Sequence, residues 1–151
     1  MKVLLVSNQR QNAWGVGNPI MYRMRDALEQ DERIEMVEFL PFSNSLFSLR
    51  EIRLSAKEYD VVHIHFGGVY ALIIWLALIG VGAKKLITFH GTDIHARALK
   101  TAKGWKERLK IWLNQKASFL SIRLFDRCGF VAAEMMDYVP KCLASHLSLI
   151  H

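Results

Sequence analysis

Short apolar runs alternate with longer segments of helical pattern along the 151 residues of this chain. The apolar runs predict strands over residues 2–7, 34–39, 60–65, 86–90 and 128–133, and residues 147–151 look like the opening of a further strand. The segments between them predict helices over residues 19–30, 46–58, 69–80, 94–125 and 134–139. This alternation predicts an α/β fold, a doubly wound parallel sheet with helices on both faces.

Three of the predicted strands run into polar loops that contain glycine. The first loop carries Gly15 and Gly17, the second carries Gly67, and the third carries Gly91. The carboxyl ends of parallel strands share one edge of a sheet, and ligands bind outside that edge. The sequence therefore predicts a ligand cleft formed by these loops.

Length and composition indicate one domain, residues 1–151, because a chain with 52% hydrophobic residues can bury one substantial core. Cys128 and Cys142 have no spacing typical of a disulfide framework, so a reducing, cytoplasmic environment fits best. The apolar stretch at the N-terminus is too short for a signal peptide.

Residues 66–83 carry no charge and reach the length at which a membrane span becomes a candidate. Glycines flank the segment, and its uninterrupted apolar part, residues 69–79, would be about 17 Å long as a helix, against about 30 Å of hydrocarbon. We therefore expect a buried crossover helix, with the span as the alternative.

Positive charge is concentrated in one region. Residues 97–127 contain nine basic and two acidic residues, whereas the other 120 residues contain 11 basic and 12 acidic ones. Trp105, Leu109 and Trp112 form an apolar stripe at helical spacing within this region. It is either an interfacial helix on an anionic membrane or an ordinary amphipathic helix; nucleic acid is disfavoured, because no binding motif accompanies the charge. The membrane-interface candidates are Lys103, Trp105, Lys106, Lys110 and Trp112.

The loop with Gly15 and Gly17 partly matches a dinucleotide-binding motif. Glycine backbones allow close approach of a phosphate at a helix N-terminus, and Glu38 could bind a ribose. However, Ile20 occupies the position of the third glycine. A dehydrogenase is thus disfavoured, while a flexible loop and a phosphate- or sugar-binding loop both remain open.

Residues 90–93 directly follow a predicted strand. The imidazole of His90 could bind a sugar hydroxyl, and Gly91 would let the ligand approach the backbone. Alternatively, Asp93 only caps a helix and His90 is a satisfied histidine at a strand end. His63 and His65 share one face of a strand, but no third metal ligand is apparent because His90 belongs to another strand, so no metal site is predicted.

Other catalytic classes find little support in the sequence. No serine lies in a G-x-S-x-G elbow, neither cysteine has a glycine-rich context, and the P-loop lysine motif is missing. Hydrolase and P-loop interpretations are therefore not supported.

The order of the segments resembles the N-terminal half of the group 1 (family 4) retaining glycosyltransferases, which have the GT-B fold. The resemblance covers nearly the whole chain. It depends on residues 2–6, the loop at 15–18, residues 60–66 and, most specifically, residues 86–93. It implies a Rossmann-like domain that mainly holds the acceptor, facing a second domain that binds a nucleotide-sugar donor.

The resemblance also implies roles for single residues. His90 would contact the transferred sugar, while Gly15 and Gly17 would approach the donor phosphates or the acceptor. The remaining substrate-binding candidates in these loops are Asn18, His65, Gly67, Gly91, Thr92 and Asp93. No permanently bound cofactor is expected, since the nucleotide sugar is a co-substrate.

The second-domain motif of such enzymes, two glutamates eight positions apart, does not occur in this chain. We therefore expect a fragment that lacks the C-terminal donor-binding domain and is inactive alone. The leading hypothesis is a glycosyltransferase of cell-surface polysaccharide or glycolipid synthesis, with a sugar or lipid-linked acceptor, peripheral at the cytoplasmic membrane face. The alternative is a non-catalytic doubly wound module that binds a phosphorylated or nucleotide ligand.

Overall fold

The computed structural model describes residues 1–7, 19–43, 45–91, 93–94 and 102–149. Four candidate residues of the sequence analysis, Gly15, Gly17, Asn18 and Thr92, lie outside the described residues.

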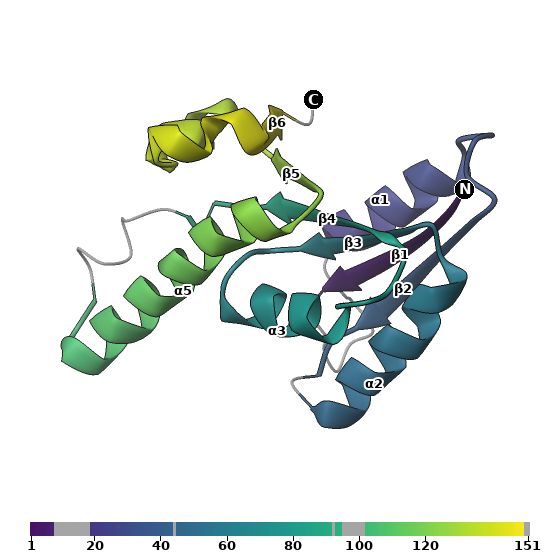
Figure 1. The fold of residues 1–151 in the computed structure, drawn as a ribbon. Coiled ribbons are helices and arrows are strands. Elements are labelled where there is room, and N and C mark those ends of the chain that lie inside the picture. Colours follow the sequence, from purple (N-terminus) through teal and green to yellow (C-terminus); the bar gives the residue numbers. More distant parts are fainter. Residues whose placement is uncertain (8–18, 44, 92, 95–101, 150–151) are drawn as a thin grey trace.

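Six parallel strands form one sheet in the order β2-β1-β3-β4-β5-β6 (Figure 1). The strands are β1 (Lys2–Ser7), β2 (Met36–Pro41), β3 (Val61–His65), β4 (Lys84–Phe89), β5 (Arg127–Phe130) and β6 (Leu147–Leu149). The helices are α1 (Pro19–Glu29), α2 (Leu46–Ser55), α3 (Val69–Ala77) and α5 (Trp105–Leu124), with short 3₁₀ segments η1 (Ala56–Glu58), η2 (Ala133–Tyr138) and η3 (Lys141–His146).

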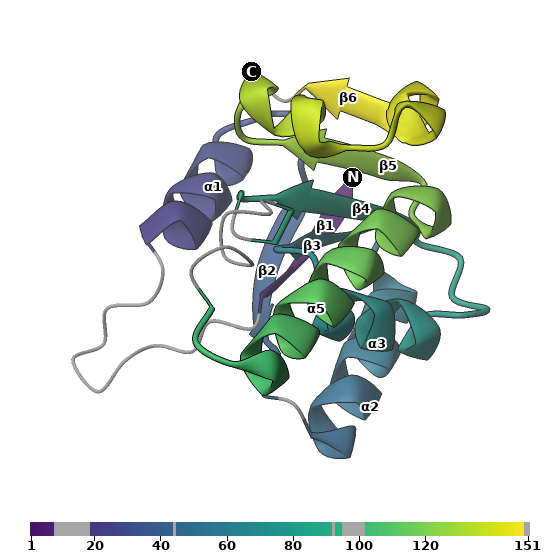
Figure 2. The same ribbon diagram turned by 90° about the vertical axis from the view of Figure 1, so that its left-hand side faces the viewer.

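Helices cover both faces of the sheet, which confirms the predicted fold class. Figure 2 shows α1 on one face and α2, α3 and α5 on the other. Right-handed crossovers explain this division, because the chain moves in one direction from β1 to β2 and in the opposite direction from β2 onward. Side chains alternate accordingly: Val3 and Leu5 pack with Met21 of α1, while Leu4 and Val6 belong to the larger core under α2, α3 and α5.

Several predicted boundaries differ from the structure, among them the end of the strand predicted over 128–133, which ends at Phe130, and two of the differences have local reasons. The strand expected from residue 34 begins at Met36, because Asp31 and Arg33 hold a turn in which the Ile34 amide donates to the Asp31 carbonyl over 2.8 Å. The long helical region expected over 94–125 is helical, among its described residues, only from Trp105 to Leu124, since Ala102 and Lys103 are not helical and Gly104 has φ +113°. Helix α5 begins after this glycine, whose conformation L side chains rarely adopt.

The expectation of a buried crossover helix at residues 69–80 is only half right. Helix α3 connects β3 to β4, and Ala71 and Ile74 are buried against the sheet. Its outer side is exposed, with Val69 at 44%, Ile73 at 39% and Leu76 at 59%. A helix between α2 and α5 can turn only part of its circumference to the sheet, so an all-apolar sequence leaves apolar residues outside. Among the described residues, no helix has the length and hydrophobicity to cross a membrane.

Candidate functional site

The candidate site lies where the direction of the sheet reverses. Strand β1 lies between β2 and β3. The chain therefore goes to one side of β1 to form β2 and then crosses to the other side to form β3. Ligands of doubly wound sheets bind at this switch point, outside the carboxyl ends of the strands. The register puts Ser7, the last residue of β1, beside His65, the last residue of β3, and β4 ends at Phe89, directly before His90. The predicted loops that begin at Phe66 and at His90 therefore both start at the expected edge, whereas the loop with Gly15 and Gly17 lies outside the described residues.

The loop after β3 has a strained start. Phe66 has φ +70°, which is unusual for a residue with a side chain, and its amide donates to the carbonyl of Thr88 on β4 over 2.9 Å. Its ring stacks on the His90 ring, with centroids 4.2 Å apart and planes 29° apart. Strain of this kind persists only where surrounding contacts hold it, and it is common at binding sites.

Asp93 joins the loop after β3 to the loop after β4. Its side chain is 6% exposed, and one carboxylate oxygen accepts the Gly67 amide over 2.6 Å. The same carboxylate accepts the His90 amide, at 3.2 and 3.3 Å from its two oxygens. The Ser118 hydroxyl of α5 donates to the Asp93 carbonyl over 2.8 Å. A single buried carboxylate thus fixes the backbone on both sides of the candidate site.

Three histidines lie together on the α1 face of the sheet. The Nε2 atom of His63 is 2.8 Å from the Thr88 hydroxyl, and the His63 and His65 rings are 4.2 Å apart. The Nδ1 atom of His65 is 3.1 Å from Nε2 of His90, so a hydrogen bond from His65 fixes the position of the His90 ring. Although His90 follows a different strand from His65, β3 and β4 are neighbours, and their ends bring the two rings together.

Burial keeps these imidazoles neutral at pH 7. It lowers the pKa of His65 to about 2, and the nearby His63 and His90 lower it further. The pKa of His63 falls to about 4 for the same main reason. Burial also lowers the pKa of His90, and the Asp93 carboxylate opposes that shift. A neutral imidazole donates at one nitrogen and accepts at the other, which suits a hydroxyl-bearing ligand.

The His65–His90 hydrogen bond also constrains the tautomers. Nε2 of His65 is buried and has no hydrogen-bond partner among the described residues. An unpaired buried N–H is rarer in proteins than an unpaired acceptor, so the arrangement favours the proton of His65 on Nδ1, donated to Nε2 of His90. The proton of His90 then resides on Nδ1. This arrangement makes His90 a hydrogen-bond donor.

Exposure separates the sequence-predicted residues of this site. His65, Gly67, Gly91 and Asp93 are buried, whereas His90 is partly exposed. Among the described residues of the predicted set, His90 is therefore the one whose side chain can meet a ligand directly. The buried residues hold it in place.

The N-terminus of α3 is already occupied by side chains. The Val69 amide donates to Oδ1 of Asn114 on α5 over 3.1 Å, and the preceding Gly67 amide is bound to Asp93. An anion at this position would compete with a carboxylate that is already there. A phosphate at the Gly67 loop is accordingly disfavoured.

Phe66, Asn114 and Ser118 contribute to the site and were missed in the sequence. Asn114 and Ser118 are four positions apart, and hence on one side of α5, facing the α3 N-terminus and Asp93. Two polar residues on an otherwise buried helix face were a usable signal. The sequence contained no signal for the backbone conformation of Phe66, since an apolar residue next to a strand does not indicate a positive φ.

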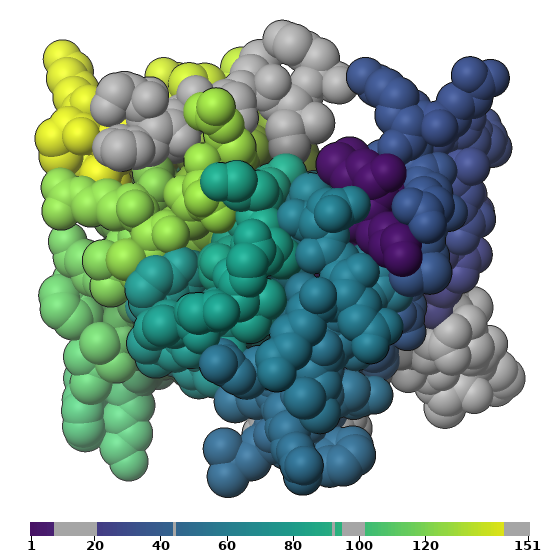
Figure 3. Space-filling view, turned by 45° about the vertical axis from the view of Figure 1, so that its right-hand side comes forward, coloured from purple at the N-terminus to yellow at the C-terminus, as the bar shows by residue number. Residues whose placement is uncertain are grey.

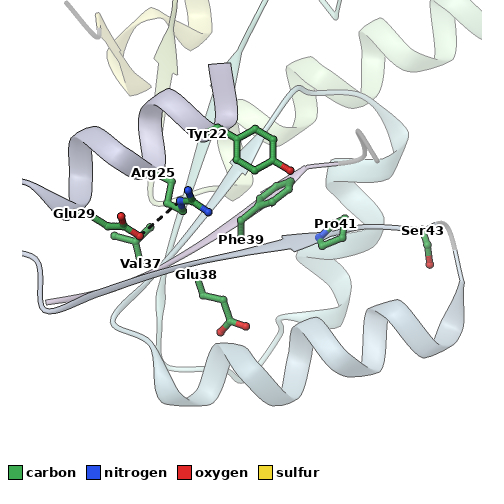
Figure 4. A pocket seen from close by; sticks show the side chains of 8 residues that line it. All are labelled: Tyr22, Arg25, Glu29, Val37, Glu38, Phe39, Pro41 and Ser43. Atoms are coloured by element: carbon green, nitrogen blue, oxygen red, sulfur yellow. Dashed lines mark ion pairs between the residues drawn. The ribbon is translucent and has the colours of Figure 1, made fainter. Parts of the chain in front are cut away.

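No group of three or more histidine, cysteine or acidic side chains in the described parts of the chain has metal-binding geometry. A separate cavity of about 730 Å³ lies between α1 and the edge strand β2 (Figure 4). Its charges are largely paired: Arg25 binds Asp26 at 2.9 Å and Glu29 at 3.6 Å. The lining residues are Tyr22, Arg25, Glu29, Val37, Glu38, Phe39, Pro41 and Ser43. The cavity contains none of the residues of the candidate site.

The five membrane-interface candidates all lie exposed at the start of α5 or just before it: Lys103, Trp105, Lys106, Lys110 and Trp112. The Lys106 ammonium lies 5.7 Å from the centroid of the Trp105 ring. The structure thus places the predicted tryptophans and lysines on one accessible segment.

The chain matches no protein-family model and no curated protein. The glycosyltransferase resemblance accordingly stays a prediction, based on the sequence motifs.

Proposed function

We propose that the chain forms the acceptor-side wall of a retaining, nucleotide-sugar-dependent glycosyltransferase that acts in cell-surface polysaccharide or glycolipid synthesis. The donor would be held by a second domain across the carboxyl edge of this sheet. One observation carries the proposal: a neutral, partly exposed His90 is held at the switch point by Phe66, His65 and Asp93. A rigid neutral donor at that position suits an uncharged, hydroxyl-rich ligand such as a sugar.

The proposed reaction makes limited demands on this domain. Transfer would form a bond between the acceptor oxygen and the anomeric carbon and break the bond from that carbon to a phosphate oxygen. Negative charge then develops on the departing nucleotide, whose phosphate takes up the proton of the acceptor hydroxyl. Backbone amides and basic residues of the second domain would stabilise that charge. His90 would orient the transferred sugar by donating from Nδ1 to one of its hydroxyls. Because the His90 ring is already held in place, its side chain loses little conformational entropy when the ligand binds.

The test measures sugar transfer by the natural full-length protein with radiolabelled UDP- and GDP-hexoses. His90→Ala should lower turnover at least about tenfold, because tenfold corresponds to about 1.4 kcal/mol and a hydrogen bond is worth roughly that much. His63→Gln is the matched control. His63 lies on the same face of the sheet as His90 but two residues before the end of β3. The amide of the Gln side chain can keep a hydrogen bond to the Thr88 hydroxyl.

Unchanged turnover in His90→Ala would remove His90 from the reaction. Binding of a nucleotide by the full-length protein without any transfer would instead favour the alternative, a doubly wound module that binds a nucleotide or phosphorylated ligand without chemistry.

A further inference from the structure

Helices α3 and α5 both expose large apolar side chains, which we call together the apolar face, and four of these side chains line one groove. On α5, Trp105 is 71% exposed, and Leu109, Trp112 and Leu113 are each nearly half exposed. The two helices pack side by side, as the Val69–Asn114 and Trp75–Leu124 hydrogen bonds show. Figure 3 shows α2 and α3 on one side of the molecule, with α5 adjoining them. The apolar face consists of Val69, Ile73, Leu76, Trp105, Leu109, Trp112 and Leu113.

A shortage of space in the core does not explain why these side chains are exposed. Both helices already bury a full face, with Ala71 and Ile74 on α3 and Ser118 and Ile122 on α5. Helix α3 nevertheless carries no charged or strongly polar side chain on its outer side. Contiguous exposed apolar surface of this kind marks an interaction site in a soluble domain.

Positive charge borders the apolar face. Lys103, Lys106, Arg108, Lys110 and Lys116 are all exposed, and the stretch they occupy contains one acidic residue, Glu107. None of these cations takes part in an ion pair between described residues. The border is therefore strongly cationic and available to an anionic partner.

The face is also hollowed where the two helices begin. A groove of about 420 Å³ there has a mainly apolar surface, and its lining residues are Val69, Trp105, Lys106, Leu109, Lys110, Leu113 and Asn114. Apolar side chains beside two lysines match the two parts of an anionic lipid, whose acyl chains are apolar and whose headgroup is negative.

We propose that the apolar face docks on the surface of an anionic lipid bilayer, with α5 lying in the interfacial plane. Tryptophans beside lysines are the pairing expected at the boundary between headgroups and acyl chains. The part of α5 that contributes to the apolar face, from Trp105 to Leu113, is about 13 Å long and would lie along the surface. The charge complementarity favours this partner over a second copy of the chain, because two copies would bring their lysines together. The inference does not depend on the proposed transfer reaction.

The experiment is flotation of the 151-residue chain with vesicles of phosphatidylcholine alone or phosphatidylcholine mixed with phosphatidylglycerol, at low and high salt. We expect binding to the mixed vesicles, weakened by salt, and a blue shift of tryptophan emission on binding. The emission is read in a Trp14→Phe background, because Trp14 lies outside the described residues. In that background, replacing Trp105 and Trp112 by Phe should abolish most of the shift, because the remaining tryptophan, Trp75, is already packed in the protein with its indole N–H bound to the Leu124 carbonyl.

Two variants separate charge from hydrophobicity. Lys106→Glu with Lys110→Glu should reduce binding to the mixed vesicles at least about tenfold, since each basic residue near an anionic surface contributes about fivefold. Leu109→Ser with Leu113→Ser should reduce binding at both salt concentrations. Lys57→Glu with Arg127→Glu is the control: it makes the same change of charge at exposed positions outside α3 and α5 and should retain most of the binding. Circular dichroism melting checks that each variant is folded.

Equal binding to neutral and anionic vesicles would overturn the proposal, as would no binding to either. A dimer in gel filtration that Leu109→Ser disrupts, without vesicle binding, would assign the apolar face to a second copy of the chain.

Discussion

Gly67 stands at a position where even one added methyl group has no space. A Cβ atom there would lie 2.5 Å from a ring carbon of Phe89 and 2.6 Å from the Ser118 hydroxyl oxygen. Neither Phe89 nor Ser118 can move away from the added atom easily. Phe89 is fully buried and stacks on Phe130 at 5.3 Å, and Ser118 is held by the carbonyls of Asp93 and Asn114 at 2.8 and 3.1 Å.

Gly67→Ala should therefore destabilise the fold. Overpacking of a rigid core costs about 1–3 kcal/mol, and a shift of the loop would also weaken the 2.6 Å bond from the Gly67 amide to Asp93. The sum, about 2–4 kcal/mol, corresponds to a decrease in melting temperature of roughly 5–15 °C for a domain of this size. Urea unfolding followed by circular dichroism gives the free energy directly.

Gly82→Ala is the matched control, because it makes the same substitution at an exposed glycine with no heavy atom within 4 Å of the new Cβ. It should be neutral or stabilise slightly, since alanine restricts the unfolded chain. A Gly67→Ala protein that unfolds within about 0.5 kcal/mol of the Gly82→Ala protein would refute the close packing described around Gly67.

Two further predictions concern the polar groups of the site. Asp93→Asn should cost about 1–3 kcal/mol in urea unfolding, because an amide side chain has one acceptor oxygen and cannot serve the Gly67 and His90 amides as a carboxylate does; a neutral result would contradict that role. Stability should also fall as pH is lowered from about 7 to about 5, because the unfolded chain takes up protons on histidines whose folded pKa values are depressed. With the pKa of His65 at about 2, its part is about 2 kcal/mol at about pH 5, and His65→Asn, which keeps a polar atom near Nδ1, should flatten the pH dependence by that amount in urea titrations at several pH values. An unchanged slope would show that His65 is not buried as described.

Period and spacing predicted the architecture well because strands in a doubly wound sheet are short, apolar and regularly separated. They also placed His65 and His90 at one edge, since parallel topology does so without any knowledge of side-chain contacts. Gly104 breaks the helical periodicity of residues 94–125 in the sequence, but that α5 begins directly after it depends on a backbone conformation that the sequence does not reveal.

The misses share a physical cause. That α3 leaves Val69, Ile73 and Leu76 exposed follows from how many neighbours surround the helix, which is a tertiary property. The positive φ of Phe66 and the binding of the Gly67 amide by Asp93 likewise depend on distant contacts, because the Phe66 amide binds Thr88, 88 − 66 = 22 positions away, and Gly67 and Asp93 are 26 positions apart. A local pattern showed Asp93 only as a possible cap.

Asp93 connects the candidate site around His90 to the apolar face formed by α3 and α5. Because one carboxylate binds the amides of both His90 and Gly67, a displacement of the His90 backbone must stretch one of these bonds or carry the start of α3 along. Val69, the first residue of that helix, forms part of the groove beside Trp105. A continuous path of contacts therefore runs from the His90 amide through Asp93 and the Gly67 amide to the first residue of α3, and it connects the candidate site to the groove at the apolar face.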